Sequence, residues 1–187
     1  MIRLARRRWP VAGAVVSCLL IAGCGGTQAD PSDPYAAEIE NARARVTSDF
    51  QREVLADGQI TRAEYERAVD LFVECLVSHG VAAAKVVNSG GYYDYSTPGD
   101  GDVGQPMMEC AQGTVTEIEY LYTERLRNPQ HLPENVIVAA CLVRLGAAPA
   151  GYTGDQFTSD QADSFQHAPF DPDTDAFRRC LVNPATP

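Results

Sequence analysis

Cysteines constrain the fold of this chain more than any other feature. Six are present, and four of them lie well beyond the N-terminus: Cys75, Cys110, Cys141 and Cys180. In an oxidising compartment an even number predicts two disulfides, with three connectivities open. Pairing between sequence neighbours would close loops of about 35 to 40 residues, worth roughly 4 kcal/mol each in the chain-entropy model.

Zinc is the competing interpretation of these cysteines. No pair has the spacing Cys-x-x-Cys, and no histidine stands at ligand spacing from a cysteine. Structural zinc sites take four such ligands at short, regular spacings. We therefore expect disulfides at these positions and no metal.

The N-terminus is typical of a secretory signal peptide. A segment rich in arginine, residues 3–8, precedes an apolar run over residues 11–22. This run is shorter than the ~20 residues that a membrane-spanning helix needs. We expect residues 1–23 to be removed during export, and the pair Arg6-Arg7 leaves the twin-arginine route open beside the general secretion route.

The end of this signal, LIAGC over residues 20–24, resembles the lipobox of bacterial lipoproteins. The resemblance implies cleavage before Cys24, attachment of a diacylglyceryl group to its thiol, and further acylation such as palmitate. Two or more acyl chains anchor a protein stably, whereas one is marginal. We expect Cys24 to anchor the chain in the lipid bilayer, at the extracytoplasmic face of the cell membrane. Residues 24–33 would form a flexible tether; an ordinary secretory signal is the alternative.

Removal of the signal leaves a strongly acidic chain. Residues 1–23 carry four arginines and no acid, so the formal net charge of -10 becomes -14 for residues 24–187. An acidic surface repels phosphate backbones, which argues against nucleic acid as a partner. The remaining 164 residues suffice for one domain with its own core. We expect residues 34–187 to form this domain.

Periodicity predicts an α+β fold that is mainly α, with five to six helices, a small β-hairpin and two disulfides. The hairpin falls over residues 82–96, where β-favouring runs flank Asn88-Ser89-Gly90-Gly91. Residues 147–173 predict at most one short helix, and a last helix begins at Asp173 or Thr174. Apolar residues recur every three or four positions in four longer segments, which are residues 34–56, 61–79, 108–128 and 133–145.

The stretch VLADGQITRAE resembles the second half of an EF-hand calcium loop. With Gly58 at position 6, Asp57 takes position 5 and Glu64 takes position 12. The first half fails, because Leu55 at position 3 offers no ligand atom and the helical period continues through it. We interpret the stretch as a helix end followed by a capping box of Thr61 and Glu64. A calcium-responsive protein is kept as an alternative function.

No catalytic motif is evident in the sequence. The three histidines fall at helix ends or in loops, without a nucleophile next to them. Glu117, Tyr120 and Glu124 share one helical face and could be drawn as paired carboxylates, but such residues more often form the wet side of an amphipathic helix. We expect no cofactor, and we favour a protein without enzymatic activity over an enzyme.

Tyr92, Tyr93 and Tyr95 form the candidate binding surface. Tyr93 and Tyr95 share one face of the predicted strand, beside an acidic loop. Surfaces that combine aromatic rings with carboxylates bind sugars and peptides, so cell-wall glycan or an envelope protein is the candidate partner. The alternative is that these tyrosines pack the hairpin on the helices.

Several stretches together resemble a group of small secreted lipoproteins of actinobacteria. They are LADGQITRAEYERAVDLFVECLVSHG, MECAQGTVTEIEYLYTERLRNP, VAACLVRLG and RRCLVNP, with the tyrosine-rich hairpin between the first two. The resemblance covers residues 45–183, and the four cysteines are its most specific part. It implies an anchored, disulfide-stapled domain and assigns no catalytic residue. We expect a non-enzymatic binding or structural role at the cell envelope, with an envelope enzyme acting on cell-wall polymer as the rival.

Overall fold

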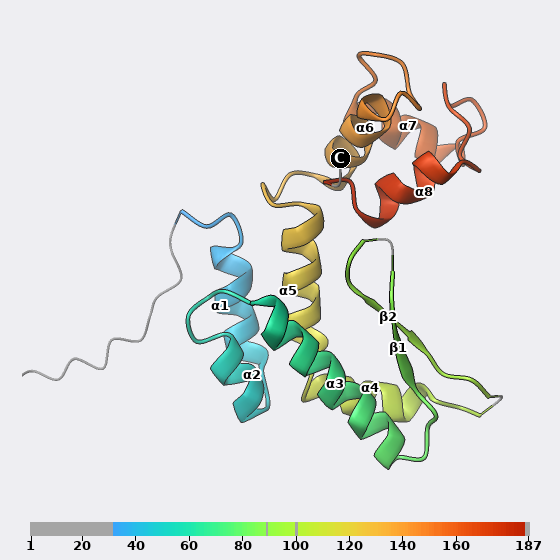
Figure 1. Cartoon of the computed structure of the whole chain (residues 1–187). Coiled ribbons are helices and arrows are strands. Elements are labelled where there is room, and N and C mark those ends of the chain that lie inside the picture. Colours follow the sequence, from blue (N-terminus) through green and yellow to red (C-terminus); the bar gives the residue numbers. More distant parts are fainter. Residues whose placement is uncertain (1–31, 89, 100, 186–187) are drawn as a thin grey trace, which may run out of the picture.

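The protein is mainly helical, with one two-stranded antiparallel hairpin (Figure 1). The structure is a computed structural model and describes residues 32–88, 90–99 and 101–185. Cys24, the signal peptide and most of the tether lie outside these residues. The elements are α1 (Ala36–Arg45), α2 (Asp49–Val54), α3 (Arg62–Ser78), β1 (Ala84–Val87), β2 (Tyr93–Ser96), α4 (Gly104–Gln112), α5 (Thr116–Arg127), α6 (Glu134–Arg144), α7 (Gly154–Ala162) and α8 (Asp175–Val182).

The predicted fold class is confirmed, but two of the predicted helices are each broken in two. The segment 34–56 becomes α1 and α2 because Val46 turns to extended backbone and Ser48 caps α2, accepting a hydrogen bond from the Gln51 amide at 3.1 Å. The segment 108–128 becomes α4 and α5, with Gly113 as the C-cap of α4. Apolar spacing runs through both breaks, so periodicity alone misses them.

The two breaks contact each other. The Gln51 side chain is fully buried and its Nε2 donates to the Thr114 carbonyl at 3.4 Å. The Thr47 hydroxyl donates to the Gln112 carbonyl at 3.3 Å. Side chains at the break between α1 and α2 thereby satisfy carbonyls at the break between α4 and α5, where a helix end leaves them without an intrahelical partner. The breaks let α2 turn back against α5 and let α4 cross beneath α3.

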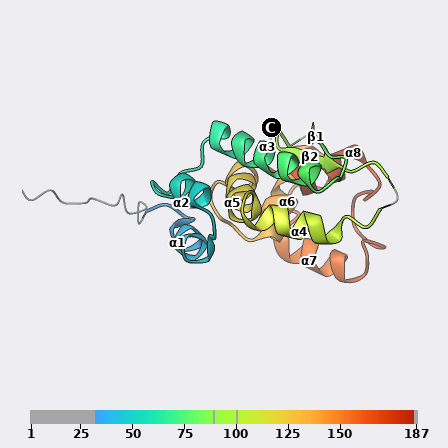
Figure 2. The same cartoon turned by 90° about the horizontal axis from the view of Figure 1, so that it is seen from below.

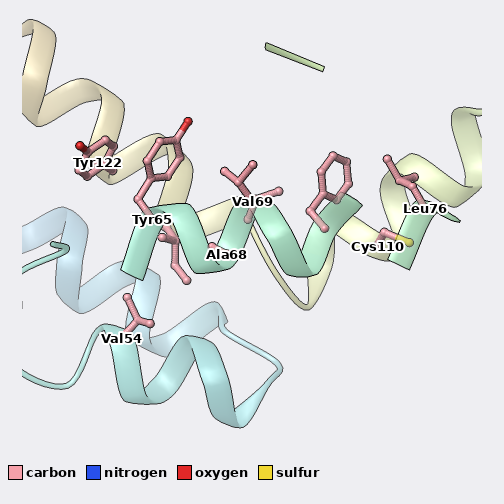
Figure 3. Packing of buried hydrophobic residues seen from close by; sticks show 10 residues of the cluster. Val54, Tyr65, Ala68, Val69, Leu76, Cys110 and Tyr122 are labelled. Atoms are coloured by element: carbon pink, nitrogen blue, oxygen red, sulfur yellow. The ribbon is translucent and has the colours of Figure 1, made fainter. Parts of the chain in front are cut away.

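Helices α1 to α5 and the hairpin share one part of the core. Helix α3 presents Tyr65, Val69, Phe72 and Leu76 to α4 and α5 (Figure 3). Viewed from below, α1 and α2 lie on the side of α5 opposite to α4 and the hairpin (Figure 2). A disulfide between Cys75 and Cys110 links the end of α3 to α4.

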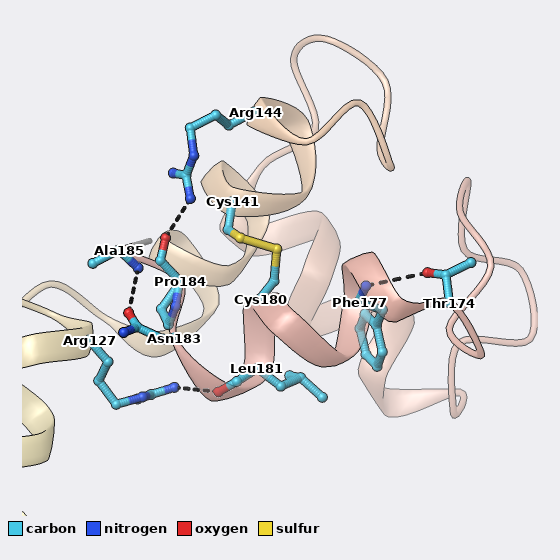
Figure 4. The surroundings of a disulfide bond; sticks show 10 residues. All are labelled: Arg127, Cys141, Arg144, Thr174, Phe177, Cys180, Leu181, Asn183, Pro184 and Ala185. Atoms are coloured by element: carbon cyan, nitrogen blue, oxygen red, sulfur yellow. Dashed lines mark hydrogen bonds between the residues drawn. A yellow bond between two sulfur atoms is a disulfide. The ribbon is translucent and has the colours of Figure 1, made fainter. Parts of the chain in front are cut away.

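Helices α6, α7 and α8 gather around a second buried cluster at the other end of the molecule (Figure 1). This cluster, built from residues 138–180, shares no buried residue with the clusters of α1 to α5. The disulfide Cys141–Cys180 links α6 to α8 (Figure 4). Two disulfides are therefore confirmed, and of the three connectivities the structure has the one between sequence neighbours.

Helices α3 and α6 end in the same way. Gly80 and Gly146 follow the C-caps with φ of 78° and 68°, a left-handed conformation that glycine adopts without strain. The next amide in each case, Val81 or Ala147, reaches back to a carbonyl of the last turn at 3.0 Å and 2.9 Å. Since each cysteine stands five residues before its glycine, both thiols occupy the final buried turn, where they cross-link the helix end.

Arg127, at the end of α5, connects the two parts. Its Nη1 and Nη2 donate to the Glu134 carboxylate at 2.7 Å and 2.5 Å, at the start of α6. Nη2 also donates to the Leu181 carbonyl at 2.8 Å, at the end of α8 (Figure 4). The carboxylate of Glu134 raises the pKa of the guanidinium further, so the bridge carries its full charge throughout the physiological range.

Arg127→Met is expected to destabilise the docking of α6 to α8. The substitution leaves Glu134 and the carbonyls of Leu181 and Val182 without their charged donor, and hydrogen bonds to charged groups are worth about 2 kcal/mol each. Hydrogen exchange of the α8 amides should accelerate in the variant. Arg178→Met is the matched control, because Arg178 forms an exposed pair with Asp175 on α8 that contributes little. Equal acceleration in both variants would contradict this role of Arg127.

Candidate functional site

A cleft of about 300 Å³ lies between α1 and α5. The two helices are held together beneath it by Ile39 and Ala42 of α1, which pack on Leu121 of α5. Residues at positions three and four apart share a helix face, so each helix presents one row of side chains to the opening. The cleft is lined by Glu38, Asn41 and Arg45 from α1 and by Glu117, Tyr120 and Leu121 from α5.

Each carboxylate of the cleft has a basic side chain as its partner. Arg45 grips Glu117 with two hydrogen bonds, Nε to Oε1 at 2.8 Å and Nη2 to Oε2 at 2.7 Å. Glu38 pairs with the Nε2 of His131 at 3.3 Å. The ring of Tyr120, in contrast, is 52% exposed at the rim. The cleft thus combines a free aromatic face with polar groups whose orientation is fixed by ion pairs.

Tyr35 and His131 support one end of the cleft. The Tyr35 hydroxyl donates to the Asn128 carbonyl at 2.8 Å, and burial together with the charge of Glu124 raises its pKa to about 12. The His131 ring lies 4.4 Å from the Tyr35 ring, and its Nδ1 donates to the Pro34 carbonyl at 3.0 Å. His131 has φ of 52°, a conformation that costs a non-glycine residue about 1 to 3 kcal/mol. The strain places its imidazole against Glu38.

The structure favours the alternative interpretation of the candidate binding surface on the hairpin, in which the tyrosines pack on the helices. Tyr92, Tyr93 and Tyr95 are half-buried and pack against the α3–α5 cluster. Their hydroxyls donate to Val182 O at 3.0 Å, Glu66 Oε1 at 3.1 Å and Glu119 Oε1 at 2.8 Å. The rings are therefore committed to fixing the hairpin, which is the alternative that the alternation of the strand left open.

Glu119 is the acceptor at the centre of this tyrosine packing. Its Oε1 accepts from the hydroxyls of Tyr95 at 2.8 Å and Tyr65 at 3.2 Å. The Tyr65 hydroxyl in turn accepts from the Tyr93 amide at 2.9 Å, which ties the hairpin backbone to α3. Burial raises the pKa of the Glu119 carboxyl, and the tyrosine hydrogen bonds oppose this shift only in part.

The stretch that resembles a calcium loop is the end of α2 followed by the capped start of α3, as the sequence predicted. The Glu64 carboxylate accepts from the Thr61 amide at 2.7 Å, and the Thr61 hydroxyl accepts from the Glu64 amide at 3.3 Å. This reciprocal capping box opens α3. Arginine side chains occupy the neighbouring carbonyls: Arg43 Nε donates to Leu55 O at 2.8 Å and Arg125 Nη1 to Gly58 O at 3.0 Å. Guanidinium groups at these oxygens repel a cation.

His79 was missed by the sequence argument against a metal. It stands four residues after Cys75, so a single helix face carries both side chains. Cys75, His79 and Cys110 bring their potential ligand atoms within 4.8 Å of one another. The statement that no histidine has ligand spacing from a cysteine was therefore wrong, because it considered only the spacings of zinc-finger motifs and ignored the helical period.

Glu119→Gln is expected to change the pH dependence of stability. A carboxyl with a raised folded-state pKa stabilises the fold fully below its unfolded value of 4.5, and this contribution is lost as the pH rises through the folded value. The amide keeps an acceptor for the tyrosines and does not titrate. The melting temperature of the variant minus that of the protein without the substitution should thus be larger at pH 7.5 than at pH 4.

Glu109→Gln is the matched control for that measurement. Glu109 is an exposed glutamate on α4, so its replacement removes the same charge without touching the tyrosine cluster. If the two variants show the same difference between pH 4 and pH 7.5, the change reflects net charge and burial of Glu119 has no part in it.

Comparison with known proteins adds no relative to this description. No protein-family model matches the chain, and searches of curated proteins and of solved structures found no match. No helix among the described residues is long and apolar enough to cross a membrane. The resemblance to small actinobacterial lipoproteins stays a prediction, and the function has to be argued from the geometry of the site.

Proposed function

We propose that the chain is a lipid-anchored protein of the extracytoplasmic face of the cell membrane, where it binds cell-wall glycan without catalysing a reaction. The observation that carries the binding role is the α1–α5 cleft, with the exposed ring of Tyr120 above ion-paired carboxylates. The anchor rests on the lipobox-like sequence that ends at Cys24.

The cleft has the chemistry that a sugar requires. A pyranose offers an apolar face of C–H groups and a rim of hydroxyls that both donate and accept hydrogen bonds. The exposed face of Tyr120 suits the first, while the amide of Asn41 and the carboxylate of Glu38 suit the second. Because Arg45 holds Glu117 through both oxygens, part of the polar lining is already ordered, which lowers the entropy cost of binding.

The position of the cleft agrees with an anchored protein. Helix α1 begins four residues after Ser32, and the eight residues from Gly25 to Ser32 reach about 28 Å when fully extended. A site on α1 would therefore stay close to the membrane, facing the inner layers of a cell wall. Two disulfides among the described residues are typical of exported proteins.

The rival function, hydrolysis of wall polymer, is less well supported by the same cleft. Glycoside hydrolysis uses two carboxyl groups, one of which must donate a proton to the leaving group. Glu38 and Glu117 both line the cleft, but both oxygens of Glu117 accept from Arg45 and Glu38 pairs with His131. Neither is free to act as the acid, so binding is the better reading of the site.

Cys24→Ser is expected to abolish lipidation. When cells that express the chain grow with an alkyne analogue of palmitate, the protein without the substitution should become labelled. It should also partition into the detergent phase of a cloud-point extraction. The variant should carry no label and stay in the aqueous phase, because a serine hydroxyl does not form the thioether. Cys18→Ser is the control and should be labelled normally. Label retained by Cys24→Ser would refute the anchor at this residue.

Tyr120→Ala is expected to weaken glycan binding about tenfold, which corresponds to about 1.4 kcal/mol. Co-sedimentation of the purified protein with insoluble cell-wall glycan measures this affinity. Met108→Ala is the control, since Met108 is 70% exposed on α4, away from the cleft. Equal binding by Tyr120→Ala and the unmodified protein would exclude this site, whereas release of soluble sugar fragments would establish the rival enzyme.

A further inference from the structure

The C-terminal end of α3 brings three side chains of metal-binding type together. The Sγ atoms of Cys75 and Cys110 and a ring nitrogen of His79 lie within 4.8 Å of one another. The sulfurs are joined as a disulfide, which has no charge to offer a metal. We propose that, once this disulfide is reduced, the two thiolates and the imidazole bind a soft metal ion, monovalent copper.

The two disulfides differ in access to solvent. Cys75 is half-buried and its partner Cys110 is 2% exposed, whereas Cys141 and Cys180 are 1% and 0% exposed. Thiol–disulfide exchange requires that a thiolate reach one sulfur of the bond. A reductant therefore reaches the Cys75 sulfur before either sulfur of the second disulfide, and the second core stays cross-linked while the site opens.

An external reductant supplies all the electrons and protons that the reduction needs, so no residue of the site takes part in it. An external dithiol gives two electrons and two protons to the Cys75–Cys110 bond, which breaks into two thiols as the dithiol closes into its own disulfide. Binding of Cu⁺ then displaces both thiol protons into solvent, because the thiolate is the ligand form of cysteine. The disulfide form and the copper form are mutually exclusive.

The electrostatics of the helix end favour a cation. The C-terminus of a helix carries a partial negative charge, and α3, with 17 residues, has no basic residue in its last turn. The His79 side chain is exposed and makes no hydrogen bond to the described part of the chain, so its ring can turn toward the sulfurs. Its backbone is already fixed as the C-cap of α3.

The ligand set selects the metal. Thiolates favour soft ions such as Cu⁺ and Zn²⁺, and protein zinc sites are almost always four-coordinate. No fourth His, Cys, Asp or Glu joins the group among the residues that the structure describes. Two thiolates and one imidazole form a complete trigonal set for Cu⁺, whereas Zn²⁺ would need a water as its fourth ligand.

Copper titration of the reduced protein tests the site. The purified full-length protein is treated with a limited amount of a water-soluble phosphine, and alkylation with mass mapping verifies that Cys75 and Cys110 are free while Cys141 and Cys180 stay paired. Anaerobic competition for Cu⁺ against a coloured chelator should then give one ion per reduced chain and none for the oxidised protein. The melting temperature of the reduced protein should rise with bound copper.

His79→Ala and His167→Ala separate this site from a simple dithiol. Both histidines are exposed, but His167 lies beside Asp163 and does not belong to the cluster of Cys75, His79 and Cys110. We expect His79→Ala to lower the Cu⁺ affinity at least tenfold and His167→Ala to leave it unchanged. The proposal fails if the reduced protein binds no copper, if the oxidised protein binds as much, if the two histidine variants bind equally, or if Cys141–Cys180 is reduced first.

Discussion

The guanidinium of Arg127 is the interaction on which the arrangement of the molecule depends. Each disulfide closes within one part of the chain, and the buried clusters of the two parts have no residue in common. Their relative position rests on residues 128–133 and on the contacts that Arg127 makes with Glu134 and Leu181. Two hydrogen bonds cross the same boundary, from the Tyr92 hydroxyl to the Val182 carbonyl and from the Asn183 side chain to the Gly90 carbonyl.

The loop at this junction also contacts the edge of the α1–α5 cleft. Asn128 is buried and its side chain both donates to and accepts from the backbone of Leu132, which shapes the connecting loop. The loop forces His131 into its left-handed conformation, and His131 reaches Glu38 at the edge of the cleft. A change in how α6 to α8 dock on α5 would therefore shift His131, and with it the contacts that His131 makes with Glu38 and Tyr35. The cleft between α1 and α5 is thus linked to this junction through His131.

Local signals in the sequence were sufficient for much of the fold. Thr61 and Glu64 mark the start of α3, Gly80 and Gly146 mark helix ends, and the cysteines five residues before these glycines indicate where the staples lie. Each of these features acts over a few residues, so its physical cause is visible in a short window. The hairpin turn is of the same kind.

Features that depend on distant partners could not be predicted in this way. The breaks at Val46 and Gly113 are stable because Gln51 and Thr114 lie together, 63 residues apart in sequence. The cleft exists only because α1 packs on α5, and the inward orientation of the hairpin tyrosines depends on Glu119, which lies on another element. Alternation along a strand tells which residues share a face and leaves open whether that face is covered.

The connectivity of the disulfides bears on how the chain matures. A protein threaded through a membrane N-terminus first, as in the general secretion route, delivers its cysteines one after another. On that route Cys110 is the first of the four cysteines to follow Cys75, and Cys180 is the next to follow Cys141. The native pairs are thus the ones that an oxidase forms by acting on cysteines in order of arrival. Such a chain can oxidise correctly in a compartment that lacks disulfide isomerase.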